Sequence, residues 1–208
     1  PKKMARISAI PASATDRAIA AVSEAFGDRF KGYDNVLEVA FMAMGGIVHS
    51  ALVLGNITRM EEGEEWCGYY YTTESISRLT HALDQDRMAV AKAYGIDTPN
   101  AASIFTAGAK PDATIREVLH PLTYERTFRN GPRKVEHRYI EEEVPYNLVT
   151  VERLGRIVGV ETPTMTRLID IYNIMRARDY RAKNTMADAL GLDSMTRDEI
   201  LARVREGY

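Results

Sequence analysis

The sequence contains little cysteine and no excess of charge of either sign. Cys67 is the single cysteine among the 208 residues, so no internal disulfide can form and a reducing compartment is expected. The 27 basic and 29 acidic residues leave a net charge of −2, which gives no general attraction to nucleic acid or to an anionic membrane surface. We therefore expect a cytoplasmic protein with neither nucleic-acid nor membrane partners.

Long apolar runs are also scarce. The longest, residues 39–55, spans about 17 residues, which is the lower limit for crossing a bilayer, and it contains His49 and the pair Gly45-Gly46. Asn35 followed by Glu38 is typical of a capped helix start. The helix predicted from there, over about 35–61, is apolar almost all round. We interpret it as a buried central helix rather than a membrane span.

Several catalytic and cofactor-binding signatures are absent. The chain has no Gly-x-Gly-x-x-Gly after a strand, no phosphate loop, no His-Glu-x-x-His and no Cys-x-x-Cys. Gly45-Gly46 falls inside the predicted apolar helix and cannot cradle a pyrophosphate there. The four histidines show no spacing that would indicate a metal site. We therefore expect the chain alone to bind a dinucleotide poorly, and to be inactive in any reaction that needs one.

The first 33 residues follow a different pattern from the rest. Arg6–Ile10 alternates like a short strand that Pro11 ends, and Thr15 can cap a helix that closes at Gly27. A lone strand leaves backbone donors and acceptors unpaired, and the remaining chain offers few convincing strand partners. Residues 1–33 are therefore interpreted as the last piece of an α/β domain whose earlier part is missing.

The helical period dominates residues 34–208, which are predicted to form a mainly α, helical bundle-like domain. Helix starts are expected at Thr73, Asn100, Asp112, Thr150, Thr162 and Thr196. A further helical turn is predicted over residues 123–130. Residues 135–148 show neither a helical nor a strand period.

His49 is the polar residue whose predicted burial would cost the most free energy. It lies midway along the most apolar predicted helix, and a buried histidine must find hydrogen bonds or open onto a cleft. The alternative is a structural histidine bonded to a backbone carbonyl. Small residues at Gly45 and Gly46, one turn earlier, would let a ligand or another backbone approach closely.

Residues 137–146 (His-Arg-Tyr-Ile-Glu-Glu-Glu-Val-Pro-Tyr) contain more charged and titratable side chains than a linker needs. Arg138 offers a bidentate fork for a carboxylate, and one of the three glutamates could fix the tautomer of a nearby histidine. The alternative for the glutamates is a solvated charge run. His81 and His120 are interpreted as structural, on an exposed helix face and at a helix end.

Three separated blocks form one pattern. The first comprises Asn35–Val39, Val48–Leu52 and Asn56–Glu61; the second comprises Tyr69–Tyr71 and Leu83–Ala91; the third is His137–Tyr146. Together they resemble the C-terminal helical domain of the opine dehydrogenases of the octopine and nopaline type. Residues 1–33 are similar to the end of the Rossmann domain of that family.

This resemblance implies an activity and its cofactors. Opine dehydrogenases join the amino group of an amino acid to a 2-oxo acid, often pyruvate, and the imine is reduced by NADH or NADPH. The NAD or NADP is bound mainly by an N-terminal dinucleotide-binding domain, which is absent from this chain. The helical domain closes over the two substrates.

The resemblance also implies roles for three residues. His49 matches the acid/base histidine, Glu143 matches the carboxylate that pairs with it, and Arg138 matches an arginine that contacts substrate. Three positions near the site depart from the family pattern: Glu143 stands where aspartate is usual, Gly45 where asparagine is frequent, and Ser50 where proline is frequent. An unusual substrate is one reading of these departures.

Two other functions stay open at this point. The chain could be a non-catalytic helical binding or dimerisation module that has drifted from an enzyme ancestor, or it could belong to a reductase of a simple 2-oxo acid. A homodimer is an open alternative to a monomer.

Overall fold

The computed structural model describes residues 4–106, 109–110, 112–125 and 130–207. Its strands are β1 (Ala5–Ile7) and β2 (Phe30–Gly32). Its α-helices are α1 (Thr15–Phe26), α2 (Val36–Phe41), α3 (Gly45–Leu54), α4 (Ile57–Glu61), α5 (Glu74–Ala93), α6 (Ala101–Phe105), α7 (Ile115–Leu119), α8 (Leu122–Glu125), α9 (Arg138–Glu141), α10 (Val149–Ile157), α11 (Pro163–Arg176), α12 (Thr185–Ala189) and α13 (Arg197–Glu206). Shorter elements are the 3-10 turns Ala12–Ala14 and Leu192–Ser194 and the π-helical segment Val144–Leu148.

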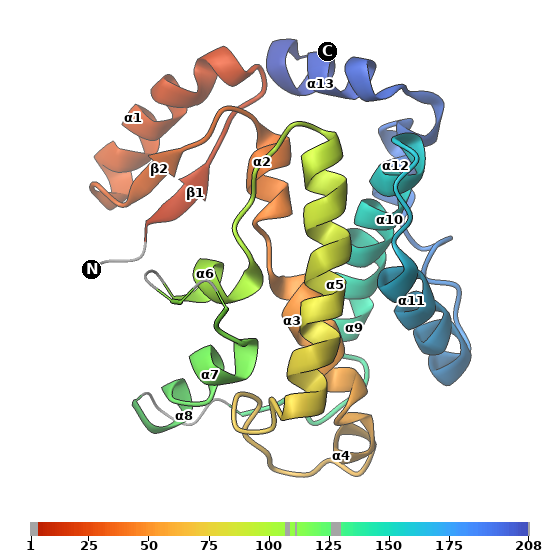
Figure 1. The fold of residues 1–208 in the computed structure, drawn as a ribbon. Helices are drawn as coiled ribbons and strands as arrows, with labels where there is room; N and C mark the ends of the chain where they lie inside the picture. The colour runs from red at the N-terminus through yellow and green to blue at the C-terminus, as the bar shows by residue number, and fades with distance from the viewer. Residues whose placement is uncertain (1–3, 107–108, 111, 126–129, 208) are drawn as a thin grey trace.

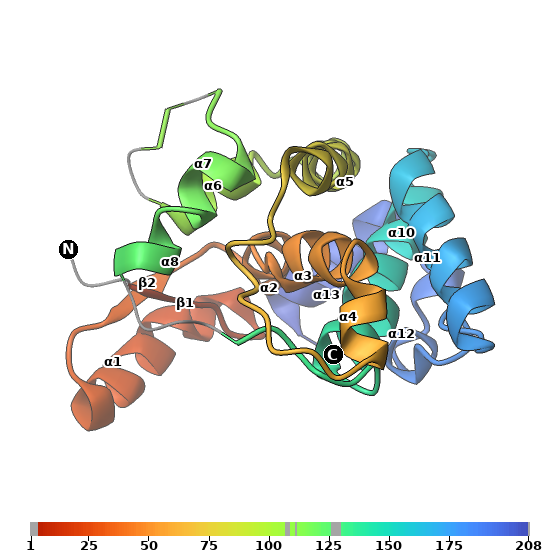
Figure 2. The same ribbon diagram turned by 90° about the horizontal axis from the view of Figure 1, so that it is seen from below.

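The helices α3 and α5 lie side by side in the middle of the view in Figure 1, and Figure 2 shows α3 at the centre of the molecule with α5 against one of its faces. They pack against each other, α9 and the π-helical segment pack on α3, and α10 and α11 pack on α5. The small unit of β1, β2 and α1 lies at one side, where α13 contacts the 3-10 turn Ala12–Ala14. The mainly α architecture expected from the sequence is confirmed.

The strand β1 has a partner that the sequence pattern did not reveal. β1 and β2 run parallel, with Ala5 opposite Phe30 and Ile7 opposite Gly32, and α1 makes the crossover between them. The expectation of few strand partners was therefore wrong for residues 1–33 themselves. Three residues ending in glycine are too short to show a period of two, so β2 is recognisable only once α1 has brought it beside β1.

The long helix predicted over 35–61 is broken into α2, α3 and α4. The first break falls before Gly45-Gly46, a pair of low helix propensity, and the side-chain amide of Asn147 donates to the carbonyl of Ala43 there. At the second break, the side chain of Asn56 donates to the carbonyl of Leu52. Val36–Leu54 is long and apolar enough to cross a membrane by length and composition, and 61% of its most apolar window is buried inside the protein.

Residues 135–148 are more regular than predicted. Ile140, Val144 and Leu148 are all fully buried at a spacing of four, so α9 and the π-helical segment present one apolar face to the core. This helical run continues directly into α10. The predicted helix start at Thr150 was therefore wrong, and its hydroxyl instead donates back to the carbonyl of Tyr146, one turn earlier.

Most other predicted helix starts are confirmed. These are Thr73 before α5, Asn100 before α6, Thr162 before α11 and Thr196 before α13. The start predicted at Asp112 was wrong, because Thr114 and Glu117 form a reciprocal capping box that begins α7 two residues later. Of the turn predicted over 123–130, α8 covers the first part, and residues 126–129 lie outside the described residues.

Candidate functional site

His49 lies midway along the buried helix α3, and its imidazole is partly exposed. Its neighbours Val48 and Ser50 on α3 are at most 1% exposed, whereas 19% of the His49 side chain is exposed. Apolar side chains on α3 drive the helix into the core, and His49 projects from it toward α9 and the segment that follows. The site therefore has both a rigid base and access to solvent.

Glu143 meets His49 across 94 residues of sequence. The Nδ1 atom of His49 and the Oε1 atom of Glu143 are 3.2 Å apart, and 12% of the Glu143 side chain is exposed. An ionised carboxylate can only accept, so Nδ1 is the donor in this hydrogen bond. In the neutral imidazole this leaves the lone pair on Nε2, at the edge of the ring away from Glu143.

Arg138 is the most exposed of the three predicted site residues. Its Nη2 atom lies 3.7 Å from the same Glu143 oxygen, and its Nε atom lies 3.4 Å from Oε2 of Glu142. With 58% of the side chain exposed, both contacts are weak in free energy. The guanidinium can therefore turn toward an incoming carboxylate at little cost. All three residues predicted from the sequence are brought together.

Two further residues of the same segment belong to this cluster, and the sequence analysis did not single them out. The ring of Tyr139 stacks on His49, and the ring of His137 meets Tyr139 edge to face at 4.6 Å. His137 begins α9, where its Nδ1 accepts from the backbone N–H of Tyr139. The pKa of His137 is lowered, first by burial and to a smaller extent by the charges of Arg138 and His49. Both residues lie inside the segment 137–146 that the sequence indicates as a site, and this position is the signal by which they could have been predicted.

The segment carrying Glu143 and Arg138 is held from its other side by Glu141. One oxygen of this carboxylate accepts from the hydroxyl of Tyr180 at 2.9 Å, and the other accepts from Lys183 Nζ and from Arg178, each at 2.7 Å. Hydrogen bonds from Lys183 and Tyr180 outweigh burial and lower the pKa of Glu141. Of the three consecutive glutamates, Glu141 thus anchors the segment, Glu143 contacts His49 and Glu142 is exposed.

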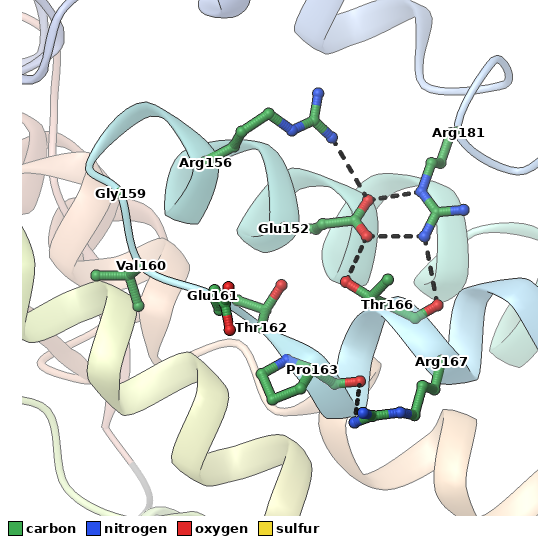
Figure 3. Close-up of a pocket in the computed structure, with 10 residues that line it drawn as sticks. All are labelled: Glu152, Arg156, Gly159, Val160, Glu161, Thr162, Pro163, Thr166, Arg167 and Arg181. Atoms are coloured by element: carbon green, nitrogen blue, oxygen red, sulfur yellow. Dashed lines mark hydrogen bonds and ion pairs between the residues drawn. The ribbon is translucent and has the colours of Figure 1, made fainter.

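A separate cavity of about 680 Å³ lies between the end of α10 and the start of α11, and it contains none of the predicted site residues (Figure 3). Glu152 lies on one wall and forms a bidentate pair with Arg181, with both N–O distances at 2.7 Å. The first free amides of α11, at Thr164 and Met165, already donate to Asp86. The charged side chains Glu152 and Asp86 are therefore used in contacts that hold the elements around this cavity together.

The described residues thus form a helical domain that carries a histidine, carboxylate and arginine cluster at its surface. Among these residues, the structure contains no group of three or more histidine, cysteine or acidic side chains that could hold a metal ion. The chemistry available to the cluster is proton transfer and the binding of carboxylates.

The comparisons with known proteins agree on one family. The model of the NAD/NADP octopine/nopaline dehydrogenase alpha-helical domain matches residues 32–176. The opine dehydrogenase of Arthrobacter sp. (strain 1C) is 29% identical over 172 residues, which is 81% of this chain and 47% of that protein. Protein ocs of Agrobacterium tumefaciens (strain Ach5) is 22% identical over 147 residues, which is 69% of this chain and 41% of that protein.

A solved structure of octopine dehydrogenase, described with NADH and L-arginine, has the same fold. Its TM-score to this chain is 0.70 at 15% identity, covering 92% of this chain and 55% of that one. The chain therefore belongs to the octopine/nopaline dehydrogenase alpha-helical domain family. It spans about half the length of the curated relatives that it matches.

Neither the β1–α1 turn nor the start of α3, both within the described part of the chain, fits the pyrophosphate of a dinucleotide. The turn from β1 to α1, residues 8–14, contains no glycine, so side chains occupy every position at which a pyrophosphate would need close backbone approach. The glycines at the start of α3 are covered by side chains of Glu143 and Asn147. These two places therefore offer no dinucleotide-binding loop.

Proposed function

We propose that this chain is the substrate-binding and catalytic half of an NAD(P)-dependent opine dehydrogenase-like oxidoreductase, which condenses an amino acid with a 2-oxo acid such as pyruvate. Family membership supports the class of enzyme. The observation that supports a catalytic role is the contact between His49 Nδ1 and Glu143 Oε1, two side chains that remain 19% and 12% exposed.

His49 is the proposed acid/base group. Forming an imine from an amine and a ketone, and then reducing it, requires proton transfers near neutral pH, where an imidazole titrates. Glu143 holds the Nδ1 proton and so directs Nε2 toward the substrate, and its charge stabilises the protonated ring. A nicotinamide cofactor supplies the hydride when it is bound.

Arg138 is the proposed substrate-binding residue. Both proposed substrates carry a carboxylate, which a guanidinium can hold through two parallel hydrogen bonds. The exposed position of Arg138 beside the His49–Glu143 pair supports this role. A carboxylate held there would lie beside the His49–Glu143 pair.

The proposal includes the organisation of the whole enzyme. Residues 1–33 are proposed to be the end of a dinucleotide-binding domain and residues 34–208 the substrate domain, with the dinucleotide-binding domain as the principal partner. The open edges of the two-stranded sheet support this, since among the described residues each strand has a partner on one side only. A cytoplasmic location is also proposed, supported by the free, buried thiol of Cys67.

The test is turnover by the full-length protein that carries this chain. NAD(P)H consumption is followed with a panel of amino acids and 2-oxo acids, for the wild type, His49→Ala and His81→Ala. His81 is an exposed residue of α5 outside the cluster and serves as the matched control. We expect turnover to fall by about 10²–10⁴-fold in His49→Ala and to be retained in His81→Ala. Retained turnover in His49→Ala would refute the catalytic role.

Calorimetry separates the enzyme from a non-catalytic module. Pyruvate or an amino acid is titrated into the 208-residue chain and into Arg138→Ala. Binding that weakens about tenfold or more in the variant supports the substrate role of the guanidinium. If the two proteins bind identically, or if neither binds any member of the panel, Arg138 does not have that role.

A further inference from the structure

Gly45 lies directly beneath the carboxylate of Glu143. A methyl group built on Gly45 would lie 2.5 Å from the Cδ atom of Glu143 and closer still to both carboxylate oxygens. Ordinary contacts of such a carbon begin at 3.4 Å. The carboxylate therefore occupies the volume that any side chain at position 45 would take.

The same carboxylate is the one that contacts His49, which lies four residues after Gly45, one turn further along α3. Glu143 thus lies across the first turn of α3, from the glycine at its start to the imidazole. The start of a helix also favours a negative charge. The carboxylate can hold this position only if nothing projects from residue 45.

We propose that Gly45 is a positioning residue for the proposed reaction: by having no side chain, it lets the Glu143 carboxylate lie flat on α3 and orient His49. This inference rests on the proposed function only for its effect on turnover. Its structural content, that residue 45 controls the tautomer of His49 through Glu143, can be measured without any reaction.

The backbone of Gly45 does not itself require glycine. Gly45 is not among the glycines with positive φ, and it lies in a helical turn, where alanine is favoured over glycine. The atoms that an added methyl group would meet are the flexible end of the Glu143 side chain. Gly45→Ala should therefore fold normally while pushing the carboxylate away from His49.

The experiment is ¹⁵N NMR of the histidine rings in the 208-residue chain, at a pH where His49 is neutral. In the wild type we expect the Nδ1–H tautomer, held by Glu143. In Gly45→Ala we expect the population to shift to the Nε2–H form, as it must in Glu143→Ala. In the double variant, Gly45→Ala should add nothing to Glu143→Ala, because the displaced group is already gone.

Gly46→Ala is the matched control. It adds the same methyl group one residue later, where it would meet the side chain of Asn147 instead of Glu143. We expect His49 to keep the wild-type tautomer in this variant. A loss of the tautomer in Gly46→Ala equal to that in Gly45→Ala would overturn the specific role of residue 45, as would a Gly45→Ala spectrum identical to the wild type.

Turnover of the full-length protein gives the second readout. We expect kcat to fall about tenfold to a hundredfold in Gly45→Ala, with the thermal midpoint unchanged or raised. If His49→Ala abolishes turnover and Gly45→Ala does not change it, the inference about Gly45 fails while the proposed function stands. If His49→Ala keeps full turnover, the proposed function fails, and the NMR result alone decides the inference.

Discussion

The aromatic ring of Tyr139 lies flat against the imidazole of His49, with ring centroids 3.7 Å apart and planes inclined by 12°. Tyr139 comes from α9 and His49 from α3, so the stack joins the two elements that carry the candidate site. A face-to-face stack fixes the plane of the imidazole but leaves its edges open. The edge bearing Nδ1 contacts Glu143, and Nε2 lies on the other edge of the ring.

We expect Tyr139→Ala to lower turnover about tenfold, because the imidazole loses the surface that sets its plane. The stack itself contributes about 0.5–1.5 kcal/mol to stability, so a modest fall in the free energy of unfolding should accompany the loss. Tyr139→Phe keeps the ring and should retain most of the turnover. Steady-state kinetics and urea unfolding of both variants test this. Equal turnover in Tyr139→Ala and the wild type would contradict it.

His137 should make the protein less stable in mild acid. Burial, followed by the charges of Arg138 and His49, lowers its pKa below the usual value of 6.5. A base whose pKa is lowered on folding binds fewer protons in the folded than in the unfolded state. Its contribution to stability is therefore complete above 6.5 and is lost as the pH falls through the lowered folded pKa.

The same protonation removes a helix cap. A protonated His137 has no lone pair on Nδ1 to accept the backbone N–H of Tyr139, so α9 loses the bond at its first turn. The test is a histidine NMR titration together with urea unfolding from pH 7 to pH 5. In His137→Asn, which keeps an acceptor but cannot titrate, the fall in stability should be smaller. The same fall in both proteins would exclude His137 as its source.

Much of the fold follows from local sequence signals. Capping patterns such as Thr196 with Glu199 place a helix start by hydrogen bonds that involve only neighbouring residues, so sequence reasoning locates them well. His49, Arg138 and Glu143 could also be selected in advance, because their side chains suit proton transfer and carboxylate binding. Their proximity rests on the packing of α9 against α3, which no local pattern encodes.

Several errors arise where contacts distant in sequence decide the local conformation, whereas the error at Asp112 comes from the local capping box of Thr114 and Glu117. The side-chain amide of Asn147 donates to the carbonyl of Ala43 at the break before α3, although the two residues are 104 positions apart in the sequence. Two of the departures from the family pattern, at Gly45 and Glu143, looked independent in the sequence but lie against each other in space. The Glu143 carboxylate occupies the volume that a side chain at position 45 would take, and it contacts His49.

Removing Asp84 should be among the most destabilising single changes in the chain. Asp84 and Arg87 form an ion pair at 2.7 Å with side chains at most 2% exposed, and the guanidinium also donates to the carbonyl of Phe41 at the end of α2. Asp84→Ala leaves a buried cation without its counter-ion, which costs about 3–5 kcal/mol. We expect a fall of that size in the free energy of unfolding by urea.

An exposed ion pair provides the comparison. Arg59 and Glu64 are 2.6 Å apart, a similarly short distance, but 33% and 47% of their side chains are exposed. Glu64→Ala should cost less than about 1 kcal/mol, because water replaces the lost partner. Similar losses in Asp84→Ala and Glu64→Ala would show that the buried guanidinium of Arg87 finds compensation elsewhere.

Glu152 should support the fold at neutral pH and cease to do so in acid. Burial raises the pKa of this carboxyl, but the hydrogen bonds from Arg181 and Thr166 outweigh it, and the pKa falls below the usual 4.5 (Figure 3). An acid whose pKa is lowered on folding stabilises the folded state above 4.5, and this contribution is lost as the pH falls through the folded pKa. Glu152→Gln should therefore be less stable than the wild type near neutrality, by about 1–3 kcal/mol.

The difference between the two proteins should shrink as the pH is lowered toward and below 4.5, since the wild-type carboxyl then loses the charge that the glutamine never had. Urea unfolding at several pH values measures it. Asp170 is the matched control, because it accepts from Nη1 of the same guanidinium, Arg181, but is 53% exposed. Asp170→Asn should change stability by less than about 1 kcal/mol at any pH. A Glu152→Gln difference that does not vary with pH would mean that the shape of the side chain, and not its charge, holds α10 to α11.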